Sequence, residues 1–77
     1  MIIVKLYAYL RDNRGKEVEI EHAEGMTIQT IVEQLNIPRD RMSIIICDGK
    51  DNAAEKMMTV KPKPDSLIHI FPPVAGG

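Results

Sequence analysis

The last twelve residues, from Ser66 to Gly77, carry no formally charged side chain, so the terminal carboxylate is the only charge in the segment. An uncharged segment can enter another protein at low cost, because burying an unpaired charge costs several kcal/mol. Gly76 and Gly77 lack a Cβ atom, so this backbone can pass through a narrow slot and a reagent can approach the last carbonyl carbon from either side. The Gly77 carboxylate is therefore the candidate reactive group of the chain.

The residues before this carboxylate predict a stiff, extended exit from a folded domain. Pro72 and Pro73 stop a strand and favour a polyproline-like path. At ~3.3 Å per residue, the six residues after Phe71 reach roughly 20 Å. We expect a folded domain over residues 1–71 and an extended, flexible tail over residues 72–77. The tail residues expected to give access to the carboxylate are Pro72, Pro73, Val74, Ala75 and Gly76.

An ordinary frayed terminus is the alternative interpretation of this segment. At average glycine usage, a Gly-Gly end arises by chance in about 0.5% of chains. The rigid, uncharged residues that precede it make coincidence a weaker explanation. We therefore favour a functional tail.

Elsewhere, the residue types that usually perform catalysis or bind metals are few and scattered. His22, Cys47 and His69 fall on different predicted elements, without the spacing of a metal site or a catalytic triad. Cys47 lies in an apolar run and is expected to be a buried core residue. Met57 and Met58 are expected to fill the core. We predict no metal site, no bound cofactor and no catalysis by the chain alone.

The composition describes one small domain. The chain has 77 residues, of which 44% are hydrophobic and 27% charged. A domain of this size buries only about 60% of its unfolded surface, so an internal catalytic cleft would remove core that it needs. Function at a face or a terminus is the better expectation.

Charge, cysteine usage and hydropathy exclude several classes of partner. A net charge of -1 and a pI near 6.1 argue against binding nucleic acid. The single Cys47 and the absence of a recognisable secretory signal predict a reduced, cytoplasmic protein. No apolar stretch approaches the roughly 20 residues that span a bilayer, so we expect no membrane association.

Period-two alternation predicts two strands near the start of the chain. Residues 1–10 are rich in β-branched and aliphatic side chains and predict the first strand. A polar connection that contains Gly15 predicts a hairpin. Residues 17–21 then alternate cleanly between polar and apolar side chains, so we expect a second strand that is wet on one side.

One amphipathic helix is predicted after this hairpin. Its apolar stripe has the i, i+3, i+4 and i+7 spacing of a helix face, at Ile28, Ile31, Val32 and Leu35. Thr27 is the expected N-cap. Asn36 and Pro38 are expected to end the helix.

Two clear strands and one weak strand are predicted in the second half. Residues 43–47 predict a buried strand that ends in a tight turn at Asp48-Gly49. Residues 57–60 predict a weak strand, and residues 61–65 a loop with two prolines. Residues 66–71 predict the final strand.

The predicted order is strand, strand, helix, strand, weak strand, strand. This order fits an α+β fold of the β-grasp (ubiquitin-like) type, with a mixed sheet of four to five strands and one main helix packed across it. The first and last strands are then parallel neighbours.

Strand alternation also predicts an exposed patch beside the root of the tail. The side chains expected to face the helix are Val4, Leu6, Ile68 and Ile70. The opposite face then carries Tyr7, Tyr9, Leu67, His69 and Phe71. Every Phe and Tyr of the chain belongs to this set, and exposed aromatic patches usually mark a binding face. We expect these five residues to form a partner-binding face.

Several stretches together resemble the ubiquitin-like sulfur carriers of the MoaD/ThiS family over essentially the whole chain. They are residues 71–77 (Phe-Pro-Pro-Val-Ala-Gly-Gly), residues 25–28, residues 48–50 and residues 4–11. Within that family the chain is most similar to the MoaD branch, the small subunit of molybdopterin synthase. The thiamin branch (ThiS) usually lacks the Phe-Pro-Pro lead-in. Residues 52–55 and 61–65 depart from the family pattern.

The resemblance implies a sulfur-donating role with three partners. A ubiquitin-activating-type enzyme uses ATP to adenylate the terminal glycine, here Gly77, and a persulfide sulfur donor displaces AMP to give a thiocarboxylate. The large subunit of molybdopterin synthase, or thiazole synthase in the thiamin branch, then receives the sulfur. A ubiquitin-like modifier conjugated through Gly77 and a plain interaction domain with an inert tail remain as alternatives.

Overall fold

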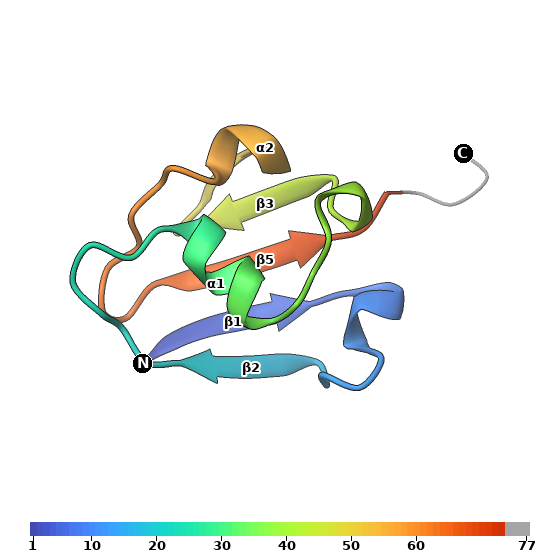
Figure 1. The fold of residues 1–77 in the computed structure, drawn as a ribbon, viewed down its shortest axis with the longest axis horizontal. Coiled ribbons are helices and arrows are strands. Elements are labelled where there is room, and N and C mark those ends of the chain that lie inside the picture. The colour runs from blue at the N-terminus through green and yellow to red at the C-terminus, as the bar shows by residue number, and fades with distance from the viewer. Residues whose placement is uncertain (74–77) are drawn as a thin grey trace.

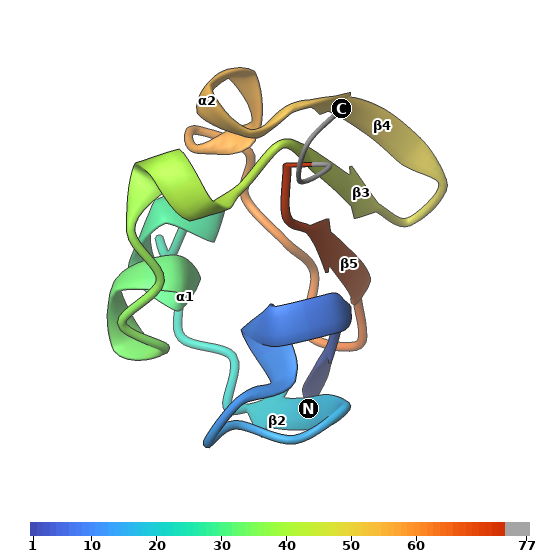
Figure 2. The same cartoon turned by 90° about the vertical axis from the view of Figure 1, so that its right-hand side faces the viewer.

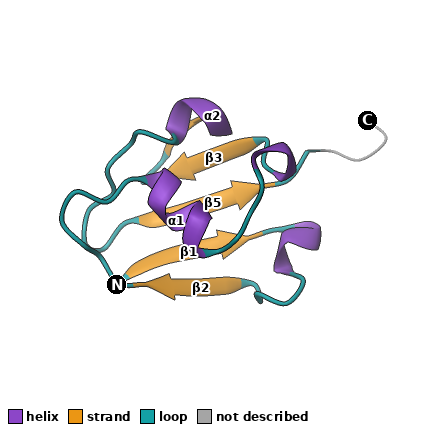
Figure 3. Cartoon of the chain, in the orientation of Figure 1, coloured by secondary structure: helices purple, strands orange, loops and turns teal. Residues whose placement is uncertain are grey.

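The computed structural model describes residues 1–73. Its strands are β1 (Ile2–Leu6), β2 (Glu17–Ile20), β3 (Ile44–Cys47), β4 (Lys50–Ala53) and β5 (Leu67–Phe71), and its α-helices are α1 (Ile28–Gln34) and α2 (Ala54–Met57). Two 3-10 turns, η1 (Ala8–Arg11) and η2 (Arg39–Arg41), follow β1 and precede β3. Figure 3 shows these elements along the chain.

The five strands form one mixed sheet in the order β2-β1-β5-β3-β4. β1 and β5 are parallel, and the other neighbouring pairs are antiparallel. Helix α1 crosses one face of this sheet (Figure 1). The predicted β-grasp fold, a mixed sheet with one main helix, is confirmed.

The core lies between α1 and the sheet. The expected inward-facing strand residues, Val4, Leu6, Ile68 and Ile70, are all fully buried. Thr27 caps α1 as predicted, since its side chain accepts a hydrogen bond from the Thr30 N–H and Thr30 reciprocates in a capping box. The Phe and Tyr side chains are absent from this core, as expected.

The first strand is shorter than predicted. It ends at Leu6, and residues 8–11 form η1. Ala8 has a φ of 52°, which no strand residue adopts and which turns the chain out of the sheet. Arg11 stabilises the turn by donating from Nε to the Leu6 carbonyl oxygen at 2.9 Å. Leu10 nevertheless stays buried, because the 3-10 turn brings it back over the core.

The weak strand was also placed wrongly. Residues 57–60 form no strand, and residues 50–53 form β4 instead. The reason is the turn at Asp48-Gly49, where both residues have positive φ and which folds the next four residues onto β3 whatever their β propensity. The carbonyl oxygens of Met58 and Val60 accept hydrogen bonds from the backbone N–H groups of Gln29 and Ile28.

The hydrogen bonds from α1 to residues 58–60 explain why residues 57–60 are not part of the sheet. The first N–H groups of a helix have no partner inside it, and residues 58–60 supply two for α1. Met57 and Met58 are buried, which confirms their assignment to the core. Within residues 1–73, neither helix is long and apolar enough to cross a bilayer.

Candidate functional site

The sheet has one face that no helix of residues 1–73 covers. Seen along the strands, α1 and α2 lie away from this side of β5 and β1 (Figure 2). The β5 side chains alternate accordingly: Leu67 is exposed, and His69 and Phe71 are half-buried. Cross-strand pairing places Ile44 beside Phe71 and Ile46 beside His69.

Sequence reasoning missed the contribution of β3 to this face. Residues 43–47 were expected to be a buried strand, but only Ile45 and Cys47 are buried, and Ile44 is 43% exposed. A run of β-branched residues predicts a strand without showing which faces are covered. The pairing of β3 with β5 would have identified Ile44 and Ile46 as part of the open face.

Three ring side chains stack on this face at the root of the tail. The Tyr7 and Phe71 ring centroids lie 4.3 Å apart, with 13° between the ring planes. His69 stacks beside them, with its centroid 5.9 Å from that of Tyr7. The Tyr7 hydroxyl also lies 2.8 Å from His69 Nδ1, within hydrogen-bonding distance. The parallel pairing of β1 and β5 brings these residues together, because Lys5 lies opposite His69 and Leu6 opposite Ile70.

Tyr9 reaches the same region by a different route from the predicted one. It lies in η1 rather than in β1, so strand alternation does not apply to it. Its ring is 38% exposed, and the guanidinium carbon of Arg41 lies 5.6 Å from the ring centroid. Tyr9 is therefore beside the stack but not part of it.

A shallow, open hollow of about 480 Å³ lies at the end of β5. Its lining is mainly apolar and includes Tyr7, Tyr9, Ile44, Phe71, Pro72 and Pro73. Pro72 is half-buried and Pro73 exposed. The hollow can receive an apolar side chain from a protein that binds this face.

Four predicted site residues, Val74, Ala75, Gly76 and Gly77, lie outside the described residues. The other predicted tail residues, Pro72 and Pro73, line the hollow. Of the predicted face, Tyr7, His69 and Phe71 are in the stack. Leu67 is 38% exposed at the start of β5.

The start of β5 is held by the Asp48 carboxylate. It accepts a hydrogen bond from the buried Ser66 hydroxyl at 2.6 Å and one from the Leu67 N–H at 2.9 Å. The bond from Ser66, and then the one from Leu67, lower the pKa of the Asp48 carboxyl below its ordinary value. Sequence reasoning assigned Asp48 only to a turn. Its link to residue 66 joins segments far apart in sequence, and no local pattern signals it.

Cys47 is buried on the helix side of β3. Burial, followed by the nearby charge of Asp48, raises the pKa of its thiol, so the sulfur stays protonated and weakly nucleophilic near neutral pH. Within residues 1–73, no three His, Cys, Asp or Glu side chains are close enough together to hold a metal ion. The open face carries the stacked rings and the apolar hollow, which can bind a partner.

Comparisons with known proteins agree with this architecture. The model of the ThiS family matches residues 4–77. A solved structure from Pyrococcus furiosus, provisionally described as molybdopterin converting factor, subunit 1, is similar with a TM-score of 0.71 at 20% sequence identity, over 95% of this chain and 97% of that chain. At that identity the similarity supports the fold alone. No significant match was found among curated proteins.

Proposed function

Since the chain belongs to the ThiS family of small sulfur carriers, we propose that it carries sulfur as a thiocarboxylate on Gly77. It acts as a co-substrate of larger enzymes in the cytoplasm and is not a catalyst by itself. Residues 1–71 form the domain that partners bind, and residues 72–77 form the tail that enters their active sites.

The observation that carries this proposal is the position of the strand from which the tail leaves. β5 is hydrogen-bonded to β1 on one side and β3 on the other, so the root of the tail is fixed to the centre of the sheet. The strand ends beside the apolar hollow and the stacked rings of Tyr7 and Phe71. A partner that binds Tyr7, Tyr9, Leu67, His69 and Phe71 therefore meets the root of the tail at a fixed position.

The proposed chemistry needs groups from the partners at each step. A Gly77 carboxylate oxygen attacks the α-phosphorus of ATP on a ubiquitin-activating-type enzyme, pyrophosphate leaves, and an acyl-adenylate forms. The terminal sulfur of a persulfide donor attacks the acyl carbon and displaces AMP, giving an acyl disulfide. A thiolate then attacks the donor's sulfur, so that a disulfide forms on the donor and the Gly77 thiocarboxylate is released. The carrier contributes the acyl group and its positioning.

Within the family, we propose that the chain is the small subunit of molybdopterin synthase. The supporting feature is the Phe71-Pro72-Pro73 lead-in, which resembles the MoaD branch. The acceptor of the sulfur is then the large subunit of that synthase. A ThiS-type role, with thiazole synthase as acceptor, is the second candidate, because the matching family model is that of ThiS.

Intact-mass analysis tests the proposal. The full chain is incubated with ATP, an adenylating enzyme of the ubiquitin-activating type and a persulfide donor. We expect a mass gain equal to the exchange of one oxygen for sulfur, located at Gly77 by fragmentation. A matched variant with one alanine added after Gly77 should show no gain. An unchanged mass for the native chain, or an equal gain in the extended variant, would reject the assignment.

Three further observations separate the alternatives. A ubiquitin-like modifier would appear as isopeptide-linked adducts between Gly77 and lysines of other proteins. Co-purification with a molybdopterin synthase large subunit or with a thiazole synthase would identify the branch. Deleting Gly76 and Gly77 without loss of function in cells would favour the inert-tail interpretation.

A further inference from the structure

The arginines of the chain gather at one end of the molecule. The sequence contains four, Arg11, Arg14, Arg39 and Arg41. All four lie in the two connecting segments at the end of the sheet where β5 finishes, namely residues 7–16 after β1 and residues 36–43 before β3. We call these four residues the arginine rim.

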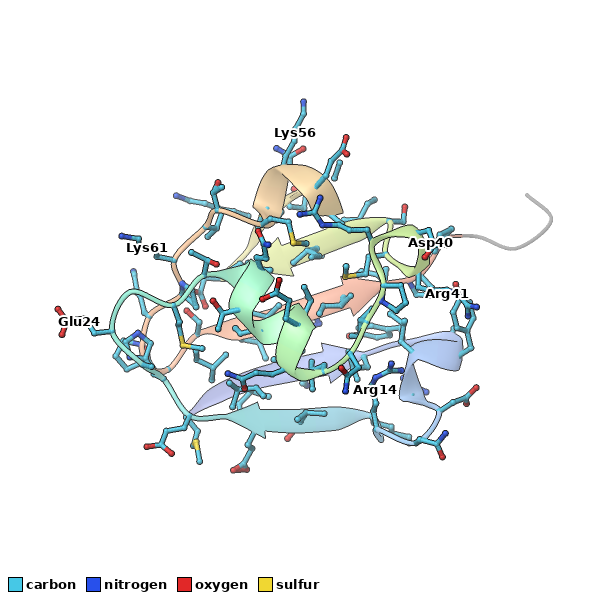
Figure 4. The ribbon with its side chains drawn as sticks, in the orientation of Figure 1. Arg14, Glu24, Asp40, Arg41, Lys56 and Lys61 are labelled. Atoms are coloured by element: carbon cyan, nitrogen blue, oxygen red, sulfur yellow. The ribbon has the colours of Figure 1, made fainter. Side chains whose placement is uncertain are left out.

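Sheet topology explains this placement. β1 and β5 are parallel and end together, and β3 begins at the same edge because it runs antiparallel to β5. In Figure 4, Arg14 and Arg41 lie toward the end of the molecule from which the tail leaves, whereas Glu24 and Lys61 lie toward the opposite end. Residues far apart in sequence thus lie at the same end of the sheet as the root of the tail.

The hydrogen bonds of Arg11 and Arg14 go to backbone carbonyl oxygens rather than to carboxylates. Arg14 donates hydrogen bonds to the carbonyl oxygens of Leu10, Leu35 and Asn36, and Arg11 donates to that of Leu6. These oxygens orient the guanidinium groups without cancelling their charge. Arg39 and Arg41 are exposed.

The rim also borders the apolar hollow. The guanidinium carbon of Arg11 lies 5.5 Å from the Tyr7 ring centroid, and that of Arg41 lies 5.6 Å from the Tyr9 centroid. Both rings line the hollow. A binding surface with an apolar centre and charged groups at its edge is the usual arrangement of a protein interface.

Charge is strongly divided along the molecule. The two segments contain five cations, the four arginines and Lys16, against two carboxylates, Asp12 and Asp40, which gives +3. The remaining residues contain five lysines and nine Asp or Glu, which gives -4 and accounts for the total of -1. This division gives the molecule a positive end that can align it toward a local acidic surface.

We propose that the arginine rim docks on carboxylates around the mouth of the channel that receives the tail in the adenylating enzyme. This inference rests on the proposed function and adds to it the charge of the partner's surface. Guanidinium groups suit this task because they pair with carboxylates through two parallel hydrogen bonds. The rim orients the carrier before contact, so that the tail arrives first and the hollow then receives an apolar side chain from the enzyme.

Charge reversal tests the proposal with a matched control. Arg39→Glu with Arg41→Glu changes the rim, while Lys56→Glu with Lys61→Glu makes the same change in net charge at exposed sites away from it. The measurement is kcat/KM for pyrophosphate release from ATP, at several salt concentrations. We expect kcat/KM of the rim variant to fall by about tenfold or more at low salt. The kcat/KM of the control should stay within about twofold of the native value. High salt should remove the difference.

If the native chain is not adenylated, that result rejects the proposed function but does not test the arginine rim. A second measurement then tests whether the rim binds carboxylates. Polyglutamate peptide is titrated into the full-length protein at low salt and followed through backbone amide shifts. The expected result is shifts confined to residues 7–16 and 36–43, reduced in the rim variant and kept in the control. The proposal would be overturned if both variants lost kcat/KM equally or if adenylation did not depend on salt. It would also be overturned if the peptide caused no amide shifts, or shifts scattered over the chain.

Discussion

The Tyr7 hydroxyl and His69 Nδ1 lie 2.8 Å apart although 62 positions separate the two residues in sequence. The hydrogen bond joins the end of β1 to β5 on the open face of the sheet. It fixes the Tyr7 ring against Phe71, the last residue of β5. The aromatic surface at the root of the tail is therefore held together by a hydrogen bond as well as by ring stacking.

Tyr7→Phe tests this hydrogen bond. The variant keeps the ring and its stacking on Phe71 but removes the hydroxyl, so we expect the free energy of unfolding to fall by about 0.5–1.5 kcal/mol. Urea denaturation measures the change. Tyr9→Phe removes the other tyrosine hydroxyl and is the matched control. A Tyr7→Phe protein as stable as the native one would show that the hydrogen bond contributes nothing.

Leu67→Glu tests the open face as the partner surface. Leu67 is 38% exposed, so a charged side chain there can reach water and should leave the domain folded. Bound to the adenylating enzyme, the carboxylate would be desolvated, and we expect affinity to fall by about tenfold or more. Isothermal calorimetry provides the measurement, with Thr59→Glu, an exposed site outside this face, as control. Unchanged affinity for Leu67→Glu would exclude this face.

Asp48 should make stability depend on pH in acid. Its pKa is lowered in the folded state, first by the Ser66 hydroxyl and then by the Leu67 N–H. The stabilisation is therefore complete above the unfolded pKa of about 3.9 and is lost as pH falls through the lower folded value. We expect Asp48→Asn to flatten the decline of unfolding free energy below about pH 4, because asparagine tolerates the positive φ but does not ionise. An identical slope in Asp65→Asn and Asp48→Asn would contradict this assignment.

Cys47 should take no part in sulfur transfer. Burial raises the pKa of its thiol, so we expect slow alkylation by iodoacetamide in the folded protein and rapid alkylation in urea. The Cys47→Ala variant should still acquire sulfur at Gly77, at the cost of a small core cavity. Loss of sulfur loading in a folded Cys47→Ala protein would assign this thiol a direct role.

Local patterns predicted most of the fold, because its main elements are encoded by short-range chemistry. The stripe from Ile28 to Leu35 and the Thr27 cap located α1, and alternation located β1, β2 and β5. Two assignments failed where the geometry of a turn overrode propensity. Ala8 ended β1 early through its positive φ, and the Asp48-Gly49 turn recruited the polar residues of β4 into the sheet.

The side chains of the candidate site that lie on β5 were also predicted from a local pattern. Alternation in β5 correctly placed Leu67, His69 and Phe71 on one face, since every second residue of a strand shares a side. The alternation of single strands did not predict the exposure of Ile44, which follows from its place beside β5. The Arg41–Tyr9 contact and the hydrogen bond from Ser66 to Asp48 join segments that are distant in sequence. Such contacts depend on the order of strands in the sheet, which one-dimensional patterns leave undetermined.

The last strand of the chain lies between two earlier ones, and this has a consequence for synthesis. β1 and β3 have no shared neighbour until β5 inserts between them, so the sheet stays split in two while the polypeptide is incomplete. A truncated or still-growing molecule would lack both its central support and the partner surface built on it. A partner that recognises this surface can therefore bind only after the residues of β5 have been translated and paired with β1 and β3.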